Sequence, residues 1–235
     1  MKIQVLISLA CLGTVSAFAM LEPETPLPAV AGPAWFDGYY QNPRPQDFLM
    51  AVHSLSASGR LDDASQVSTA IGFFATVFES HPQKVETWLA RTRGLPEAHR
   101  RILAAAAWKA GHTSGARLLR EMSSNDDALN AEIVALTRQA PSAIADTPVL
   151  SASSLNLQWG AYLASGDARH IVAIVSALGS QQPGLGQSAV RTLARNAVSH
   201  PEVLAICRAE MERQPAAVRE MFSTALAGGA NRPGA

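Results

Sequence analysis

The sequence has few charged residues and no excess of either sign. Of its 235 residues, 16% are charged, and the 19 basic side chains balance the 19 acidic ones. Because binding to nucleic acid depends on an excess of positive charge, we do not expect a dedicated DNA- or RNA-binding protein. Hydrophobic residues make up 48% of the chain, too many for a disordered protein. The sequence is therefore that of a globular protein, short enough to form one domain.

The first 19 residues contain no acidic side chain and have the features of a secretory signal peptide. A basic start at Lys2 precedes a mostly apolar run that ends in Ala17-Phe18-Ala19, so we predict cleavage after Ala19. One alternative is a membrane anchor, but the run is shorter than the roughly 20 residues that cross a bilayer, and no transmembrane span is expected. The other is a lipoprotein modified at Cys11, although leucine is missing three residues before this cysteine.

Lysine is also scarce, and acceptor sequences for N-glycosylation are absent. The chain has three lysines against sixteen arginines, and no Asn-x-Ser/Thr sequence occurs. An arginine- and alanine-rich composition is typical of a GC-rich bacterial genome, and the missing acceptor sites give no support for a eukaryotic secretory route. We therefore predict a periplasmic or secreted bacterial protein.

Cysteine is nearly absent, with Cys11 and Cys207 the two in the chain. Removal of the predicted signal peptide leaves Cys207 alone, so the exported protein cannot form an internal disulfide. Cys207 lies four residues from both Val203 and Met211, on the apolar face of a predicted helix. We interpret it as a buried small hydrophobic residue rather than a reactive thiol.

Proline is concentrated near the start of the predicted mature chain. Six of the fourteen prolines fall in residues 20–45, a density that predicts extended, polyproline-like backbone. The same segment carries four aromatic residues between Trp35 and Tyr40. Because a free linker would hardly expose so much apolar surface, we expect this segment to pack onto the rest of the protein.

Residues 46–227 read as a single helical domain, and residues 228–235 as a disordered tail. Alternating strand patterns are lacking, and apolar residues recur with helical spacing. The clearest stripes are Val67, Ile71, Phe74 and Phe78; Ile102 to Trp108; Leu129, Ile133 and Leu136; Ile171, Ile174, Val175 and Leu178; and Val218, Met221, Phe222 and Ala225. We predict an all-α fold without a sheet, an irregular helical array or α-solenoid of about ten short antiparallel helices.

Turn signals separate the predicted helices. The glycines expected to end helices are Gly59, Gly94, Gly111 and Gly166. Thr113 or Ser114 is expected to cap the helix that follows Gly111. Trp159-Gly160 with Tyr162 and Gly166 resembles part of a tetratricopeptide helix pair in architecture, while the alanine spacing and terminal proline of that repeat do not follow. The resemblance extends to the arrangement of helices and implies no family membership.

No known catalytic motif is present in the linear sequence. The six histidines are His53, His81, His99, His112, His170 and His200. No two of them have the spacing of metal ligands with a nearby third ligand, and no Gly-x-Ser-x-Gly occurs. Residues 184–189 match the dinucleotide-binding pattern formally, but no strand is predicted before them, so we interpret them as a loop that leads into a helix from Ser188. We expect no catalytic residue, cofactor or metal.

Charge is distributed unevenly along the chain. Residues 84–120 contain eight basic and two acidic side chains, whereas residues 121–167 contain six acidic side chains and one basic. The simpler interpretation is that neighbouring helices present complementary or solvated faces. The alternative is a positive surface for an anionic ligand. Its candidate contacts are Arg91, Arg93, Arg100 and Arg101, which would have to converge.

The leading hypothesis is a protein-binding or scaffold module without catalytic activity, whose partner is another protein of the cell envelope. The candidate partner contacts are Trp35, Tyr39 and Tyr40, because aromatic residues dominate interface energetics. The competing interpretation of these three residues is a lid over the first helices. Two alternative functions remain: a binder of an anionic ligand through residues 84–120, and a periplasmic hydrolase whose site combines His53, His99 or His170 with dispersed acidic residues.

Overall fold

The computed structural model describes residues 33–138 and 140–230 of the chain. These residues form twelve α-helices and no β-strand, which confirms the predicted all-α helical array. The α-helices are α1 (Pro33–Gly38), α2 (Phe48–Ala57), α3 (Val67–Ser80), α4 (Val85–Arg91), α5 (Glu97–Lys109), α6 (Thr113–Ser123), α7 (Asp127–Thr137), α8 (Ala152–Ser165), α9 (Ala168–Ser176), α10 (Leu185–Ser199), α11 (Pro201–Met211) and α12 (Ala216–Ala230). Five 3-10 helices join them: η1 (Tyr39–Gln41), η2 (Pro45–Asp47), η3 (Pro82–Lys84), η4 (Ile144–Asp146) and η5 (Ala177–Gly179).

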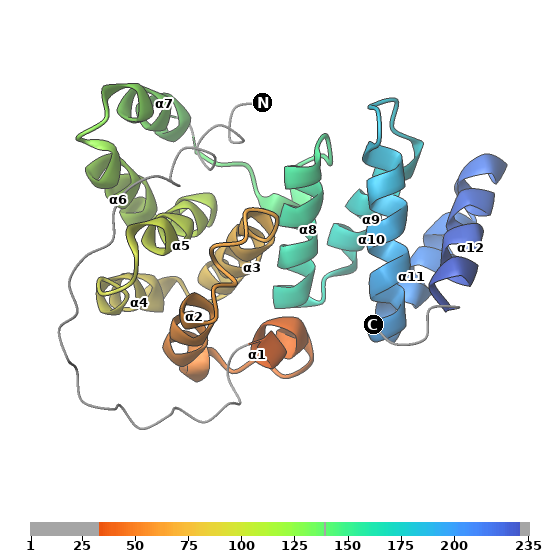
Figure 1. Ribbon diagram of the computed structural model, residues 1–235, viewed down its shortest axis with the longest axis horizontal. Coiled ribbons are helices and arrows are strands. Elements are labelled where there is room, and N and C mark those ends of the chain that lie inside the picture. The colour runs from red at the N-terminus through yellow and green to blue at the C-terminus, as the bar shows by residue number, and fades with distance from the viewer. Residues whose placement is uncertain (1–32, 139, 231–235) are drawn as a thin grey trace.

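The helices lie side by side along the long axis of the molecule (Figure 1). Contacts run from α7 through α6 and α5 to α3, and from α8 through α9 to α11, with α10 packed on both α11 and α12. The two halves meet where α3 packs against α8, which is the most extensive contact between any two helices described. Because α3 and α8 are far apart in the sequence, the array is not a simple succession of neighbouring hairpins.

Glycines allow α3 and α8 to approach closely. A Cβ atom on Gly160 of α8 would collide with the backbone carbonyl of Thr69 in α3, and a Cβ on Gly72 of α3 would collide with the carbonyl of Leu157 in α8. Neither glycine has a positive φ. These positions therefore require glycine because it has no side chain, not because its backbone is freer. The position of α3 at the centre of the protein depends on this close approach.

A continuous hydrophobic core joins helices from α1 to α12. Its largest aromatic group surrounds Phe73 of α3, whose ring lies 5.2 Å from that of Trp35 and 4.2 Å from that of Phe36. Phe48 of α2 stacks on Trp88 of α4 at 4.2 Å. A smaller cluster of Ala104, Leu119 and Ile133 joins α5, α6 and α7. The periodic apolar residues predicted from the sequence therefore face one another, as amphipathic helices require.

The prediction of extended backbone over residues 20–45 is wrong for the part that the structure describes. Residues 33–38 form α1, and residues 39–41 and 45–47 form η1 and η2. Proline is tolerated in a first helical turn, where its missing N–H would have no intrahelical partner, and Pro33 and Pro45 occupy such positions. The nine residues between Pro33 and Pro43 contain no proline, which leaves room for a short helix.

The predicted helix ends are mostly correct. Gly59, Gly111 and Gly166 have positive φ angles of 73°, 76° and 68°, so they follow α2, α5 and α8 in the left-handed conformation that glycine adopts without strain. Gly94 is not in this conformation. The cap of α6 also differs from the prediction: Nδ1 of His112, not Thr113 or Ser114, accepts the hydrogen bond from the free N–H of Ser114.

Several predictions concern the ends of the chain. The proposed signal peptide of residues 1–19 and Cys11 lie outside the described residues. Helix α12 continues to Ala230, into the first three residues of the predicted tail. Over residues 33–138 and 140–230, no helix combines the length and hydropathy that a membrane span requires.

Cys207 is fully buried, and burial raises the pKa of its thiol to about 12, so its interpretation as a core residue is confirmed.

Candidate functional site

Ser56, Asp62 and His99 form a hydrogen-bonded chain where α2 meets the start of α5. The Oγ atom of Ser56 lies 2.8 Å from Nδ1 of His99, and Nε2 of the same ring lies 2.7 Å from Oδ1 of Asp62. Ser56 belongs to the last turn of α2, Asp62 to the turn that follows, and His99 to the first turn of α5. The structure thus joins one of the histidines considered for a hydrolase site to a carboxylate, together with a serine that no sequence motif indicated.

The hydrogen bonds determine where the protons lie. An ionised carboxylate only accepts hydrogen bonds, so Nε2 of His99 must donate to Asp62. In a neutral imidazole the other nitrogen then carries no proton. In this neutral form of the ring, Nδ1 accepts from the hydroxyl of Ser56. This is the proton arrangement of a serine paired with a general base, with the roles of the two ring nitrogens exchanged relative to the usual triad.

The three side chains differ in exposure. His99 is 1% exposed, so its ring is held by the surrounding core. The Asp62 side chain is 65% exposed, and Ser56 is half-buried. The buried imidazole thus joins an exposed carboxylate to a half-buried serine.

A small pocket adjoins the same loop. It is lined by Phe36, Leu55, Arg60, Leu61, Gln66 and Ala70 and has a volume of about 20 Å³. Arg60 lies 4.0 Å from Asp37, and its Nη1 atom is buried without a hydrogen-bond partner among the residues described. The loop between α2 and α3 therefore carries Asp62 of the hydrogen-bonded chain and a buried guanidinium nitrogen of Arg60 that is paired with Asp37.

His170 and His200 are two further buried histidines, each with a polar partner. Nδ1 of His170 lies 2.7 Å from Oε1 of Gln158, whose amide nitrogen in turn donates to the carbonyls of Ile144 and Thr147. This network fixes the segment before α8 and contains no nucleophile. His53, the third histidine considered for a hydrolase, is exposed on α2.

His200 connects η1, near the start of the described chain, to the beginning of α11. Its Nδ1 lies 3.0 Å from the hydroxyl of Tyr40, which is also 3.3 Å from Oε2 of Glu202. The rings of Trp159 and Tyr162 pack against this group. The contact attaches η1 to the start of α11 and is a structural junction.

The two buried histidines make stability depend on pH. Burial lowers the pKa of both His170 and His200, although Asp167 opposes the shift at His170, and Asp37 and Glu202 oppose it at His200. Below the unfolded pKa of about 6.5, the unfolded chain therefore binds more protons than the folded one. Stability is complete above that pH and decreases as the pH falls towards the lowered folded values.

We therefore expect the Tm, followed by circular dichroism, to be lower at pH 5.5 than at pH 7.5. The variant His170→Gln/His200→Gln should show a smaller difference between the two values. The exposed His53 provides a control, since His53→Gln should leave the pH dependence as in the unmodified protein. A double variant that retains the full dependence would show that other groups cause it.

A surface groove of about 480 Å³ lies between η4 and the following segment on one side and α9 with η5 on the other. Its lining residues are Ala145, Asp146, Thr147, Pro148, Val149, Leu150, Ala173, Ser176, Ala177, Gly179 and Ser180. The Leu150 side chain is 59% exposed, although most leucines in the described chain are buried. The groove therefore combines accessible apolar surface with one carboxylate, that of Asp146.

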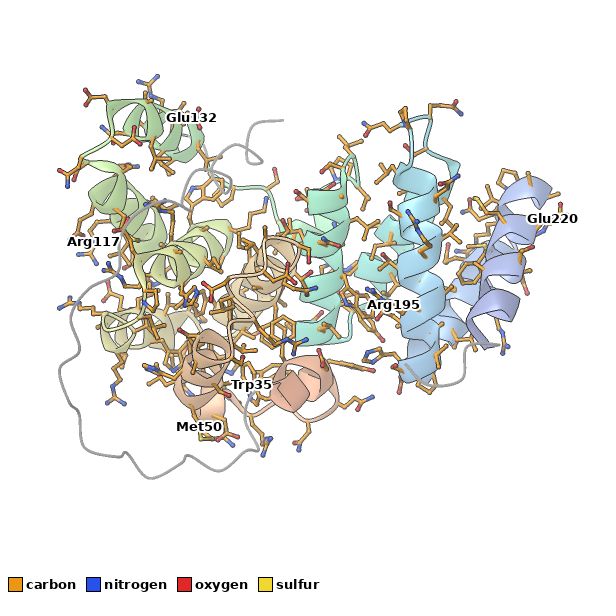
Figure 2. The ribbon with its side chains drawn as sticks, viewed as in Figure 1. Trp35, Met50, Arg117, Glu132, Arg195 and Glu220 are labelled. Carbon is orange, nitrogen blue, oxygen red and sulfur yellow. The ribbon has the colours of Figure 1, made fainter. Side chains whose placement is uncertain are left out.

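Trp35 and Tyr39, the proposed partner contacts, lie in the core. Each is 3% exposed, and their rings contact one another at 4.8 Å (Figure 2 shows Trp35 between α1 and α2). Tyr40 is half-buried and hydrogen-bonded to His200. Burial removes Trp35 and Tyr39 from the surface, so the partner-contact interpretation does not hold for these two residues, and the interpretation as packed elements of the body is the better one.

The four arginines proposed to bind an anion are spread over α4 and α5. Arg91, the last residue of α4, and Arg93, in the turn that follows, are exposed, whereas Arg100 and Arg101 are half-buried on α5. Consecutive residues leave a helix about 100° apart, so the side chains of Arg100 and Arg101 diverge. Arg101 forms an ion pair with Glu97 at 2.6 Å. The convergence that a shared anion site requires is therefore missing for this pair.

The charged stretches do not pair with each other either. None of the ion pairs in the described part of the chain joins residues 84–120 to residues 121–167. Arg117 on α6 and Glu132 on α7 extend outwards from this end of the array (Figure 2). Of the two simpler interpretations, solvated faces describe these helices better than complementary ones.

The remaining motifs do not form a site. The glycine-rich residues 184–189 follow η5 rather than a strand, and α10 begins at Leu185, three residues earlier than predicted. Within residues 33–138 and 140–230, no three His, Cys, Asp or Glu side chains are grouped as a metal site would need. Searches against protein-family models, curated proteins and solved structures give no significant match, so the function has to be argued from the residues of this chain.

Proposed function

We propose that the protein is an exported helical module that binds an extended peptide segment of another envelope protein. The observation that supports this most directly is the groove between residues 145–150 and 173–180. The proposal keeps the protein-binding role that we inferred from the sequence and moves the binding surface away from Trp35 and Tyr39.

The accessible leucine of the groove is the first argument. A single exposed leucine is ordinary on a protein surface, but Leu150 lies beside Pro148 and Val149 and opposite Ala173 and Ala177. Apolar side chains from two segments thus border one depression. A partner that covers Leu150 would remove its apolar surface from water, which favours association by about 25 cal/mol per Å².

The shape and charge of the groove indicate the kind of partner. The wall formed by α9 and η5 presents small residues, among them Ala177, Gly179 and Ser180, so the main chain of a bound peptide can approach closely. Asp146 is the charged residue of the lining. We therefore expect an extended peptide with apolar side chains and one lysine or arginine that pairs with Asp146, in agreement with charge complementarity at interfaces.

Site-specific crosslinking in the native host tests the proposal. A photoreactive amino acid is placed at Leu150 in the groove, and in a matched control at Val198, which is also apolar and is 68% exposed but lies on α10 outside the groove. We expect the Leu150 probe to give one reproducible adduct, whose crosslinked peptide is apolar with a basic residue. The control should not give this adduct.

A synthetic copy of that peptide then tests the affinity. Leu150→Asp should weaken its binding at least about tenfold, which corresponds to about 1.4 kcal/mol, and Asp146→Asn should weaken it less. Equal adducts from Leu150 and Val198, no adduct at Leu150, or unchanged affinity of the Leu150→Asp variant would each contradict the proposal.

A further inference from the structure

We propose that Ser56 is the nucleophile of an acyl-transfer site that hydrolyses esters with short acyl chains, with His99 as general base and Asp62 as the residue that orients it. The inference rests on the hydrogen-bonded chain Ser56–His99–Asp62 and is independent of the groove at Leu150. It gives specific residues to the hydrolase alternative that the sequence left open.

The first argument is the direction of the hydrogen bonds. Asp62 accepts from Nε2 of His99, so Nδ1 is free to take the proton of the Ser56 hydroxyl, 2.8 Å away. A serine paired in this way loses its proton to the base as it attacks, which a solitary serine cannot do. Because His99 is 1% exposed, its ring is held in the orientation that the transfer needs.

The reaction balances with these three residues and water. The Ser56 oxygen forms a bond to the ester carbonyl carbon while its proton passes to Nδ1 of His99. The bond from that carbon to the alkoxy oxygen then breaks, and the alcohol leaves with the proton from His99. In the second half, His99 takes a proton from water, the water oxygen binds the acyl carbon, and Ser56 leaves and regains the proton. The products are one carboxylic acid and one alcohol.

The first turn of α5 supplies the N–H groups that we assign to the negative charge developing on the carbonyl oxygen. The first backbone hydrogen bond of α5 runs from Arg100 to Pro96, so the N–H groups of residues 97–99 have no carbonyl partner within the helix. The residue that supplies the general base also supplies one of these N–H groups.

The surroundings limit the acyl group. The pocket beside Leu55 and Leu61 has a volume of about 20 Å³, little more than one water-sized sphere occupies. This cavity cannot hold a long acyl chain, whereas an acetyl group requires none. Esters of acetate are therefore the expected substrates, and longer acyl esters should react more slowly.

Labelling of the unmodified protein gives the first test. The purified full-length protein is treated with a fluorophosphonate, which reacts with activated serines, and the modified residue is found by peptide mass spectrometry. We expect modification at Ser56 and none at Ser58. Ser58 is an exposed serine two residues further along the chain, and its hydroxyl donates to the Leu55 carbonyl instead of to a histidine. Because this test needs no variant, it does not depend on how substitutions fold.

Hydrolysis of p-nitrophenyl acetate gives the second test. Ser56→Ala should reduce kcat/KM about 100-fold, in the range that a general base and its nucleophile contribute, whereas Ser58→Ala should retain the full rate. Asp62→Asn should lower kcat and shift its pH profile, because the amide can donate to the ring and no longer fixes the proton on Nε2. A structural role alone would not move that profile.

Two outcomes would overturn the inference. One is a fluorophosphonate adduct that is absent from Ser56 or equally present at Ser58. The other is hydrolysis by Ser56→Ala at the rate of the unmodified protein, with circular dichroism showing that both are folded. Neither outcome affects the groove proposal, since the Leu150 crosslink is measured separately and on another part of the array.

Discussion

Gly160→Ala is expected to lower the free energy of unfolding by about 3 kcal/mol and the Tm by about 6–12 °C. The added Cβ atom would collide with backbone atoms of Thr69 and Phe73 on α3. A flexible side chain can turn aside, but a backbone carbonyl moves only if its helix moves. Thermal unfolding followed by circular dichroism measures the effect directly.

The control is Gly94→Ala. A Cβ on Gly94 meets no atom within 4 Å, and Gly94 has no positive φ, so alanine should change stability by no more than about 0.5 kcal/mol. A loss at Gly160 without a loss at Gly94 would assign the effect to the close approach of α3 and α8. Equal Tm values for the unmodified protein and Gly160→Ala would show that the two helices are not in the contact described.

Gly72 extends the same argument to the other helix. Its Cβ would meet the backbone of Leu157 on α8, so Gly72→Ala should destabilise by a similar amount. Once one alanine has moved the helices apart, the second has less to displace. The double variant should therefore lose less than the sum of the two single losses, as expected for residues that share one contact.

The helical array was predictable because its helices satisfy local rules. Val67, Ile71, Phe74 and Phe78 recur with helical spacing, and the structure places them in or against the core as part of α3. Glycines that were predicted to end helices also adopt the left-handed conformation at helix ends, as Gly166 does after α8. Such patterns depend on residues close in sequence, so one sequence is enough to reveal them.

Contacts between distant segments were not predictable in this way. His99 meets Ser56 across 43 residues, and neither residue belongs to a motif that marks the pair. The joining of α3 to α8 depends on Gly72 and Gly160, which in the sequence are two of sixteen glycines. The signal that could have indicated their importance is a glycine within an otherwise good helix, since glycine costs a helix about 1 kcal/mol relative to alanine.

The aromatic segment shows how composition can mislead. Four aromatic residues among prolines suggested either a binding element or a lid, and the composition is the same for both. The two interpretations differ in whether the core contains other aromatic residues against which the segment can pack. Phe48 of α2 and Phe73 of α3 lie outside the aromatic segment and supply the surface on which Trp35 packs.

Trp35→Ala is accordingly expected to lower the free energy of unfolding by about 3–5 kcal/mol, the range for removing a buried large aromatic side chain. The ring contacts those of Tyr39, Phe48 and Phe73, and its Nε1 donates to the carbonyl of Arg44 at 3.3 Å. The variant therefore loses packing against three rings and one hydrogen bond, and it leaves a cavity between α1, α2 and α3. Chemical denaturation at 25 °C measures the loss.

Two further variants decide what Trp35 does. Trp35→Phe keeps most of the apolar volume and should be clearly more stable than Trp35→Ala, whereas Tyr40→Phe removes only a half-buried hydroxyl and should cost about 1 kcal/mol. If Trp35 is a core residue, the stability of each variant should follow the side-chain volume that remains at position 35. The peptide captured at Leu150 should then bind every folded variant with the affinity of the unmodified protein. A Trp35→Ala protein with unchanged stability that no longer bound the peptide would restore the partner-contact interpretation and would require α1 to leave the core on binding.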